Sequence, residues 1–67
     1  MKFKAIEFET AHQAMSHAAA EGGEAILING KRMVVSEDTA GRLEEAKVEF
    51  AYLCDHGGRI VTIPVND

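Results

Sequence analysis

The feature that most constrains the fold is the pair Asn29-Gly30, which separates two short runs rich in apolar side chains. Asn-Gly is the preferred sequence for a two-residue type I′ turn, because both positions need positive φ. The pair therefore predicts a β-hairpin over residues 24–28 and 31–35. The register set by the turn places four apolar side chains on one face: Ile26, Ile28, Met33 and Val35. The other face is also mostly apolar, so both faces need cover from water.

The length of the chain makes that cover difficult to supply. A domain of 67 residues buries only about 60% of the surface that its unfolded chain exposes, so small domains often depend on disulfides, metals or oligomerisation. Cys54 is the only cysteine, which excludes an internal disulfide. Two helices, one on each face, would remove the need for a partner, but the helices predicted here have narrow apolar stripes. We therefore expect a homo-oligomer or a protein partner, with this interaction surface: Ile26, Ile28, Met33 and Val35.

Two segments have the apolar spacing and the start signals of helices. Residues 10–21 begin with Thr10 and Gln13 at capping-box spacing, and a glycine pair follows them. Their apolar stripe is mostly alanine: Ala11, Ala14, Met15, Ala18 and Ala19. Residues 37–46 follow Ser36, which predicts a cap. The stripe of this second helix is narrow: Ala40, Leu43 and Ala46.

Three further segments have the composition of β-strands. Residues 2–8 combine aromatic and β-branched side chains, although the alternation of apolar positions slips within the segment. Residues 48–54 and 59–65 predict a second hairpin, with a glycine pair between them for the turn. Pro64 lacks a backbone donor, which indicates that the last strand lies at an edge of the sheet.

The order of these elements is β-α-β-β-α-β-β. It predicts an α+β fold in a single domain over residues 1–67, with a mainly antiparallel sheet and two short helices. A helix followed by a hairpin occurs twice, over residues 10–38 and 39–67, and both units begin Thr-Ala and end in Asp. Few other positions match, so we interpret the αββ units as a similarity of architecture rather than as a duplication.

The net charge of the chain disfavours broad binding to nucleic acids. It is −4, whereas a protein that neutralises phosphates needs a surplus of bases. Four residues are candidate nucleic-acid contacts, and we interpret them as ordinary solvated charges: Lys2, Lys4, Lys31 and Arg32. The charges near the N-terminus are too close together for a signal peptide, and no run approaches the roughly 20 apolar residues of a membrane span. We therefore expect no membrane association and a cytoplasmic location.

Cys54 and His56 are the residues most suited to chemistry. They are two apart, so on a strand they would point the same way, and a thiolate beside an imidazole can act as a nucleophile or metal ligand. His12 and His17 could add metal ligands. However, the chain has no Cys-x-x-Cys or His-Glu-x-x-His pattern, and its only Gly-Lys pair lacks the spacing of a nucleotide-binding loop. We predict no catalytic residue, no metal site and no cofactor.

Residues in and around the first hairpin follow a recognisable order: a Gly-Glu-x-hydrophobic strand, a Gly-Lys turn, a second hydrophobic strand and a Ser-x-Asp helix start. They are Gly23, Glu24, Ile26, Ile28, Gly30, Lys31, Val34, Val35, Ser36, Asp38 and Leu43. Over about residues 5–45 this pattern resembles the N-terminal domain of the prevent-host-death (Phd/YefM) antitoxins. The resemblance implies a dimer that binds operator DNA. The helical, toxin-binding tail of that family is replaced here by the strands predicted over 48–54 and 59–65.

Three functions follow from these observations. The first is a small non-enzymatic protein-interaction module that self-associates or serves as a subunit of a larger assembly. The alternative is a Phd/YefM-like antitoxin that acts as a dimeric DNA-binding repressor, with Lys2, Lys4, Lys31 and Arg32 as its contacts. The third is a small enzyme that uses Cys54 and His56. We favour the first, because the sheet is apolar on both faces and the chain is too short to cover both easily. We rank the enzyme last, because no convergent set of acid, base and oxyanion donors is visible.

Overall fold

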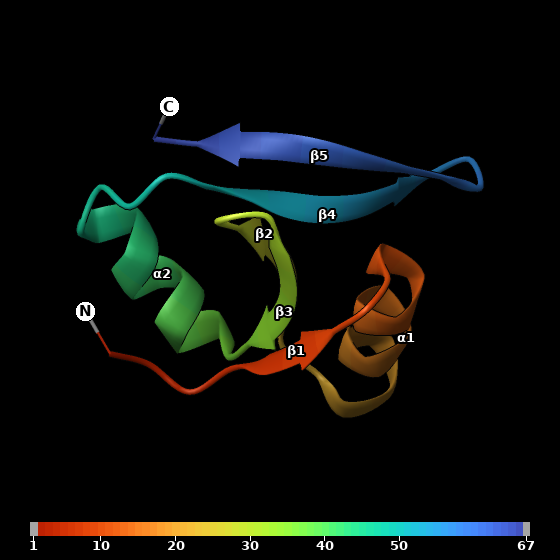
Figure 1. Ribbon diagram of the computed structural model, residues 1–67, viewed down its shortest axis with the longest axis horizontal. Helices are drawn as coiled ribbons and strands as arrows, with labels where there is room; N and C mark the ends of the chain where they lie inside the picture. Colours follow the sequence, from red (N-terminus) through yellow and green to blue (C-terminus); the bar gives the residue numbers. More distant parts are fainter. Residues whose placement is uncertain (1, 67) are drawn as a thin grey trace.

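A computed structural model describes residues 2–66 of the chain (Figure 1). The elements are β1 (Ile6–Phe8), α1 (Ala11–Glu21), β2 (Glu24–Ile28), β3 (Lys31–Val35), α2 (Glu37–Glu45), β4 (Phe50–His56) and β5 (Arg59–Val65). The strands form an antiparallel five-stranded sheet in the order β1-β3-β2-β4-β5. The predicted α+β class and element order are confirmed, and so is the position of the last strand at an edge.

Tight turns set the registers of the two hairpins. Asn29 has a φ of 51° and Gly30 a φ of 76°, as the type I′ turn between β2 and β3 requires. All five residues of β2 pair with β3 in the register that this turn predicts. Gly57 and Gly58 form the second turn with φ values of 62° and 83°, and they set the pairing of β4 with β5 in the same way.

The two helices lie on opposite faces of the sheet (Figure 1). The face under α2 contains a cluster of buried side chains that includes two from the helix: Ile26, Ile28, Val35, Ala40, Leu43 and Phe50. The face under α1 contains a second buried cluster: Ala14, Ala25, Val34 and Leu53. Because residues of β2 contribute to both clusters, this strand is covered from both sides.

The predicted interaction surface lies inside the chain's own core. Ile26 has 0% of its surface exposed, Ile28 has 6% and Val35 has 3%, and Met33 is half-buried against the same cluster. The prediction that these four residues bind a partner is therefore wrong. The narrow stripe of α2 suffices because other apolar side chains close the cluster around it: Phe3, Met33, Val48, Tyr52 and Val65.

Local hydrogen bonds fix the start of each helix. The Thr10 hydroxyl accepts a bond from the Gln13 backbone at 3.1 Å, and Gln13 Oε1 accepts one from the Thr10 backbone at 3.2 Å, so the predicted capping box is present. Ser36 Oγ accepts a bond from the Thr39 backbone at 3.1 Å, which confirms the predicted cap of α2. The stripe of α1 is narrower than predicted, because Ala19 is exposed.

Several element boundaries differ from the predicted ones. β1 begins at Ile6 rather than at residue 2, because only three of its residues pair with β3. α2 ends at Glu45, and Lys47 adopts a φ of 62°, so residues 46–49 connect the helix to the sheet. β4 therefore begins at Phe50, and it continues to His56 because a two-residue turn lets both strands pair up to the turn itself.

Gly23 occupies a position that a larger residue would not fit. Its φ is +102°, and an ideal Cβ built on it would lie 2.6 Å from the carbonyl oxygen of Val35 and 3.2 Å from a methyl group of Val34. Glycine therefore lets the chain leave α1 and enter β2 directly against β3.

The helix-plus-hairpin pattern occurs twice, as α1-β2-β3 and as α2-β4-β5, with the two helices on opposite faces. The predicted second unit ends at Asp67, which lies outside the described residues. Within residues 2–66 neither helix has the length and apolar character needed to cross a bilayer.

Candidate functional site

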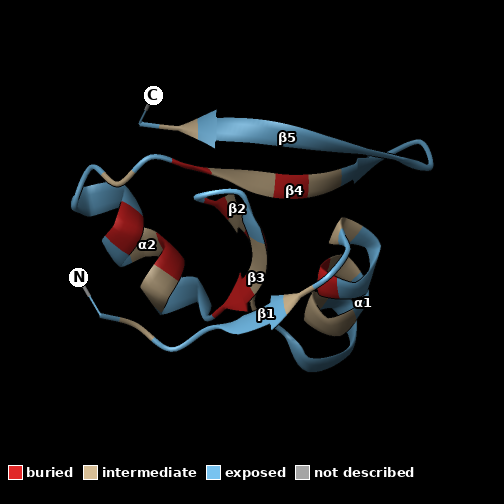
Figure 2. Cartoon of the chain, in the orientation of Figure 1, coloured by how far each residue is buried: buried red, intermediate tan, exposed pale blue. Residues whose placement is uncertain are grey.

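The most prominent apolar surface of the described residues is on β5. Its exposed fractions are 41% for Ile60, 40% for Val61 and 51% for Ile63. Six of its seven residues are exposed, and Figure 2 shows the strand almost entirely in the colour of exposed residues. We refer to Arg59–Val65, with the side of the strand that faces away from β4, as the β5 edge.

The turn decides which backbone groups of β5 face solvent. In a hairpin with a two-residue turn, the residues beside the turn exchange both hydrogen bonds, and bonded positions then alternate along the strands. Arg59 and every second residue after it therefore bond to β4, whereas Ile60, Thr62 and Pro64 direct their backbone groups outward. Since Pro64 has no N–H, the β5 edge offers the N–H donors of Ile60 and Thr62 and the carbonyl oxygens of all three residues.

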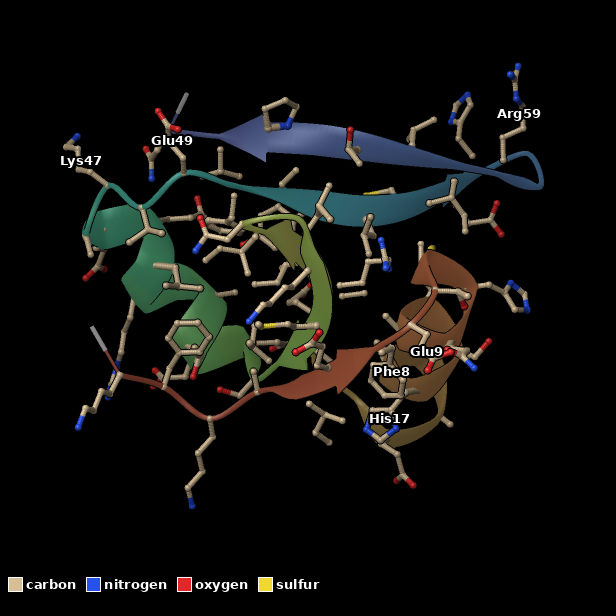
Figure 3. All side chains as sticks on the ribbon, in the orientation of Figure 1. Phe8, Glu9, His17, Lys47, Glu49 and Arg59 are labelled. Carbon is tan, nitrogen blue, oxygen red and sulfur yellow. The ribbon has the colours of Figure 1, made fainter. Side chains whose placement is uncertain are left out.

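The side chains of β5 point to both faces of the sheet, beyond the cover of the helices. Val61 and Ile63 lie on the face that α2 covers, and Ile60 lies on the face that α1 covers. All three are exposed, so neither helix covers this part of the last strand. The only charged residue of β5 is Arg59, beside the turn at the far end of the hairpin (Figure 3).

The other edge of the sheet differs in length and charge. β1 has three residues, and its central residue is Glu7. Ile6 in this strand has the same exposed fraction as Ile63, 51%. Natural sheets commonly protect their edges by keeping them short or charged. β1 follows this rule, whereas the seven residues of β5 carry no charge after Arg59.

Two side-chain contacts hold the second hairpin to α2. The Tyr52 hydroxyl donates a hydrogen bond to Glu44 Oε2 at 2.6 Å, and Asn66 Nδ2 donates one to the Glu44 carbonyl oxygen at 2.9 Å. Burial of the Tyr52 phenol, together with its hydrogen bond to the Glu44 carboxylate, raises the pKa of Tyr52 to about 12. The contacts attach both strands of the hairpin to the end of α2, so the β5 edge is held in place.

The four candidate nucleic-acid contacts are divided between two parts of the surface. Lys31 and Arg32 begin β3, whereas Lys2 and Lys4 precede β1. Lys4 lines the same groove as the first residues of α2, beyond the other end of β3. Because β3 has five residues, at about 3.3 Å each, the two pairs are separated by about 13 Å or more. Arg32 is half-buried, so it is not the fully solvated charge that the sequence predicts.

Cys54 and His56 lie on the same face of β4, as predicted. Cys54 is half-buried opposite Val61, and His56 is exposed beside the turn. His17 lies in α1, where its ring is 5.2 Å from that of Phe8 (Figure 3). Among residues 2–66 no three His, Cys, Asp or Glu side chains gather as a metal site would require. The absence of a catalytic role for Cys54 and His56 stays a prediction.

An open groove of about 840 Å³ lies between residues 3–6, the end of α1 and the start of α2. Ionisable side chains of both signs line it: Lys4, His17, Glu21, Glu37 and Arg42. Since cationic and anionic groups both line this open hollow, the groove does not favour one chemical class of ligand.

The sequence predicts exposed apolar side chains on the first hairpin, whereas the structure places them on the β5 edge. The two hairpins have similar apolar patterns, and nothing within either segment says which one the helices will cover. Pro64 was the available signal, because it indicates an edge strand and therefore a strand with one neighbour.

Comparisons with protein-family models, with curated proteins and with solved structures gave no match. The resemblance to the Phd/YefM antitoxins stays a prediction. The function is therefore inferred from the surface that the structure describes.

Proposed function

We propose that this protein is a small non-enzymatic interaction module that self-associates through its β5 edge. The observation that carries the proposal is an edge strand of seven residues that pairs with β4 on one side only and has three exposed apolar side chains: Ile60, Val61 and Ile63. Addition of another strand to such an edge satisfies its backbone groups and buries its side chains in the same step.

The distribution of charge permits a second copy of the chain at this edge and disfavours one at the β1 edge. The net charge is −4, so two copies repel one another on average. β5 contains no acidic residue and has one base, Arg59, at its start. Two β5 edges can approach without placing carboxylates face to face, whereas antiparallel pairing of two β1 edges would bring the Glu7 side chains of both copies together.

The expected affinity is modest. Full burial of a Val or Ile side chain contributes about 1.5 to 3 kcal/mol, so burial of the remaining exposed part of Ile63, 51%, contributes about 1 kcal/mol. An interface of one strand from each copy is smaller than the usual area of about 800 Å² per partner. Association also costs at least about 4 kcal/mol in lost freedom of motion. The three exposed side chains of each copy and the edge hydrogen bonds exceed this cost by about 5 kcal/mol, so we expect a weak dimer with a dissociation constant of about a few hundred micromolar.

Analytical ultracentrifugation of the full chain tests this proposal, over concentrations from about tenfold below to tenfold above that dissociation constant. The weight-average mass should rise from one chain to two. Ile63→Lys should shift this rise to concentrations at least about tenfold higher. Ile6→Lys is the matched control, because Ile6 has the same exposed fraction, 51%, on the other edge strand. A constant monomer mass for the unaltered chain, or equal weakening by both variants, would contradict the proposal.

The DNA-binding repressor remains the second proposal. Its support is the element order β-α-β-β-α over the region that resembles the Phd/YefM domain. The separation of Lys4 from Lys31 and Arg32 counts against one compact phosphate-binding patch. Titration with duplex DNA at low salt tests it, and binding should weaken steeply as salt is added. Indifference to DNA at low salt would leave the interaction module as the better proposal.

A further inference from the structure

The geometry points to one particular pairing of the two copies, an inference that rests on the proposed self-association. We infer that two β5 strands pair antiparallel about a two-fold axis beside Thr62, so that Thr62 faces Thr62 of the second copy. The five-stranded sheets of both copies then become one continuous antiparallel sheet. The axis is perpendicular to this sheet, so both α2 helices lie on one face and both α1 helices on the other.

The outward backbone groups restrict the register. Only Ile60, Thr62 and Pro64 direct their groups away from β4, and Pro64 lacks a donor. With Thr62 opposite Thr62, the two threonines exchange two hydrogen bonds, and each Ile60 N–H donates to the Pro64 carbonyl oxygen of the other copy. The total is four bonds across the edge. A register with Val61 opposite Val61 also makes four, through Ile60 and Thr62 alone.

The exposed side chains distinguish these two registers. With Thr62 on the axis, Val61 faces Ile63 of the other copy on the α2 face, and Ile60 faces Pro64 on the α1 face. Every exposed apolar side chain of β5 then has an apolar partner. With Val61 on the axis, each Ile63 faces Arg59 instead, and each Ile60 faces Thr62. The backbone bonds are equal in number, so the apolar pairs favour the register centred on Thr62.

Disulfide trapping tests the register in a Cys54→Ala background, which removes the native thiol. Directly opposite residues at a bonded pair have their Cα atoms about 5.5 Å apart, within the range of a disulfide. Thr62→Cys should therefore give a covalent dimer on mild oxidation, at concentrations where the unaltered chain is dimeric. Val61→Cys should crosslink much more slowly, because residue 61 lies opposite residue 63 of the other copy and not opposite the second introduced cysteine. Faster crosslinking by Val61→Cys would overturn the register centred on Thr62.

A charge exchange gives an independent test. Val61→Glu and Ile63→Lys should each weaken the dimer at least about tenfold, because each places a charge opposite an apolar side chain. The double variant should recover most of the lost affinity, since residue 61 of each copy then faces residue 63 of the other with opposite charge. In the competing register the glutamates would face one another, and the double variant would stay weak. That result would refute the inference.

The results of these experiments distinguish failure of the register centred on Thr62 from failure of the proposed self-association. If the unaltered chain stays monomeric in ultracentrifugation, the proposed self-association fails. If Ile63→Lys weakens the dimer and Ile6→Lys does not, but neither thiol variant crosslinks and the double variant does not recover, the β5 edges pair in another register and the register centred on Thr62 fails alone. If the chain dimerises and Ile63→Lys has no effect, the dimer uses another surface and both the proposal and the register fail. Circular dichroism and thermal melting of each variant at low concentration confirm that the fold persists, which keeps loss of folding apart from loss of association.

Discussion

Replacement of Gly23 by alanine should destabilise the protein more than any other single methyl addition at a glycine. Two constraints act on Gly23, its backbone conformation and the space around it. Its φ of +102° lies in a region that side-chain-bearing residues rarely adopt, and its Cβ would lie 2.6 Å from the backbone oxygen of Val35. Neighbouring Gly22 has a similar φ, +89°, but an added Cβ there would meet nothing within 4 Å. The pair therefore separates backbone strain from steric collision.

Backbone strain and steric collision together set the size of the loss of stability. A residue with a Cβ in this part of φ/ψ space costs about 1 to 3 kcal/mol, and Gly22→Ala should show that cost alone. Gly23→Ala must also push β3 away or bend the end of α1, which adds about 1 to 3 kcal/mol by analogy with overpacked cores. A domain of 67 residues has a total stability of about 3 to 10 kcal/mol, so Gly23→Ala should remove a large part of it.

Urea denaturation followed by far-ultraviolet circular dichroism measures all the variants in one series. Gly41→Ala is a further control, since Gly41 lies within α2 with open space around it, and its replacement should stabilise the protein by about 0.5 to 1 kcal/mol. The expected order of stability is Gly41→Ala, unaltered chain, Gly22→Ala, Gly23→Ala. Equal stability of the Gly22 and Gly23 variants would show that the approach of Val35 to Gly23 carries no energetic weight, and would refute the reasoning.

Three other predictions concern the core, a helix cap and pH. Leu43→Ala should cost about 3 kcal/mol in urea denaturation, because Leu43 is completely buried under α2, and a cost below about 1 kcal/mol would mean that the site collapses around the gap. Thr10→Ala should cost about 1 kcal/mol through loss of the α1 capping box, and an unchanged urea midpoint would show that water replaces it. The pKa of Tyr52 is about 12 in the fold against an ordinary 10.0, so its neutral form is favoured by folding. That contribution is fully present below pH 10 and is lost between pH 10 and 12. It should amount to about 1 kcal/mol after solvent screening, and Tyr52→Phe should abolish that part of the pH dependence.

Local chemistry predicts the elements of this fold well. The turn residues Asn29 and Gly30 define one hairpin and its register, and Thr10 and Ser36 define where the helices begin, because each signal acts within a few residues of the chain. Boundaries are less predictable where the outcome depends on pairing. Residues 2–5 have strand composition, but β1 begins only at Ile6, where β3 supplies a partner.

The local sequence pattern does not predict which apolar side chains are buried. Ile26 in β2 and Ile63 in β5 both lie in apolar segments between turns, yet their exposed fractions are 0% and 51%. The difference arises because β2 is inside the sheet with a helix on each face, whereas Ile63 is in the edge strand at a position that neither helix covers. Strand order and helix placement are properties of the whole chain, so the sequence pattern could not show which hairpin keeps its apolar side chains exposed.

The two hairpins meet where β2 pairs with β4, and the shortness of this pairing affects how the molecule unfolds. β2 and β4 share two paired residues in their ladder, whereas β4 and β5 share seven. A partial unfolding event would therefore separate the chain along this seam and release β4 and β5 together as an intact ribbon. Amide hydrogens of β4 that bond across the seam should exchange with deuterium before those that bond to β5. In concentrated solution the released ribbon of one molecule could dock on the exposed β2 of another. Separation of β4 from β2 is therefore a route to domain swapping.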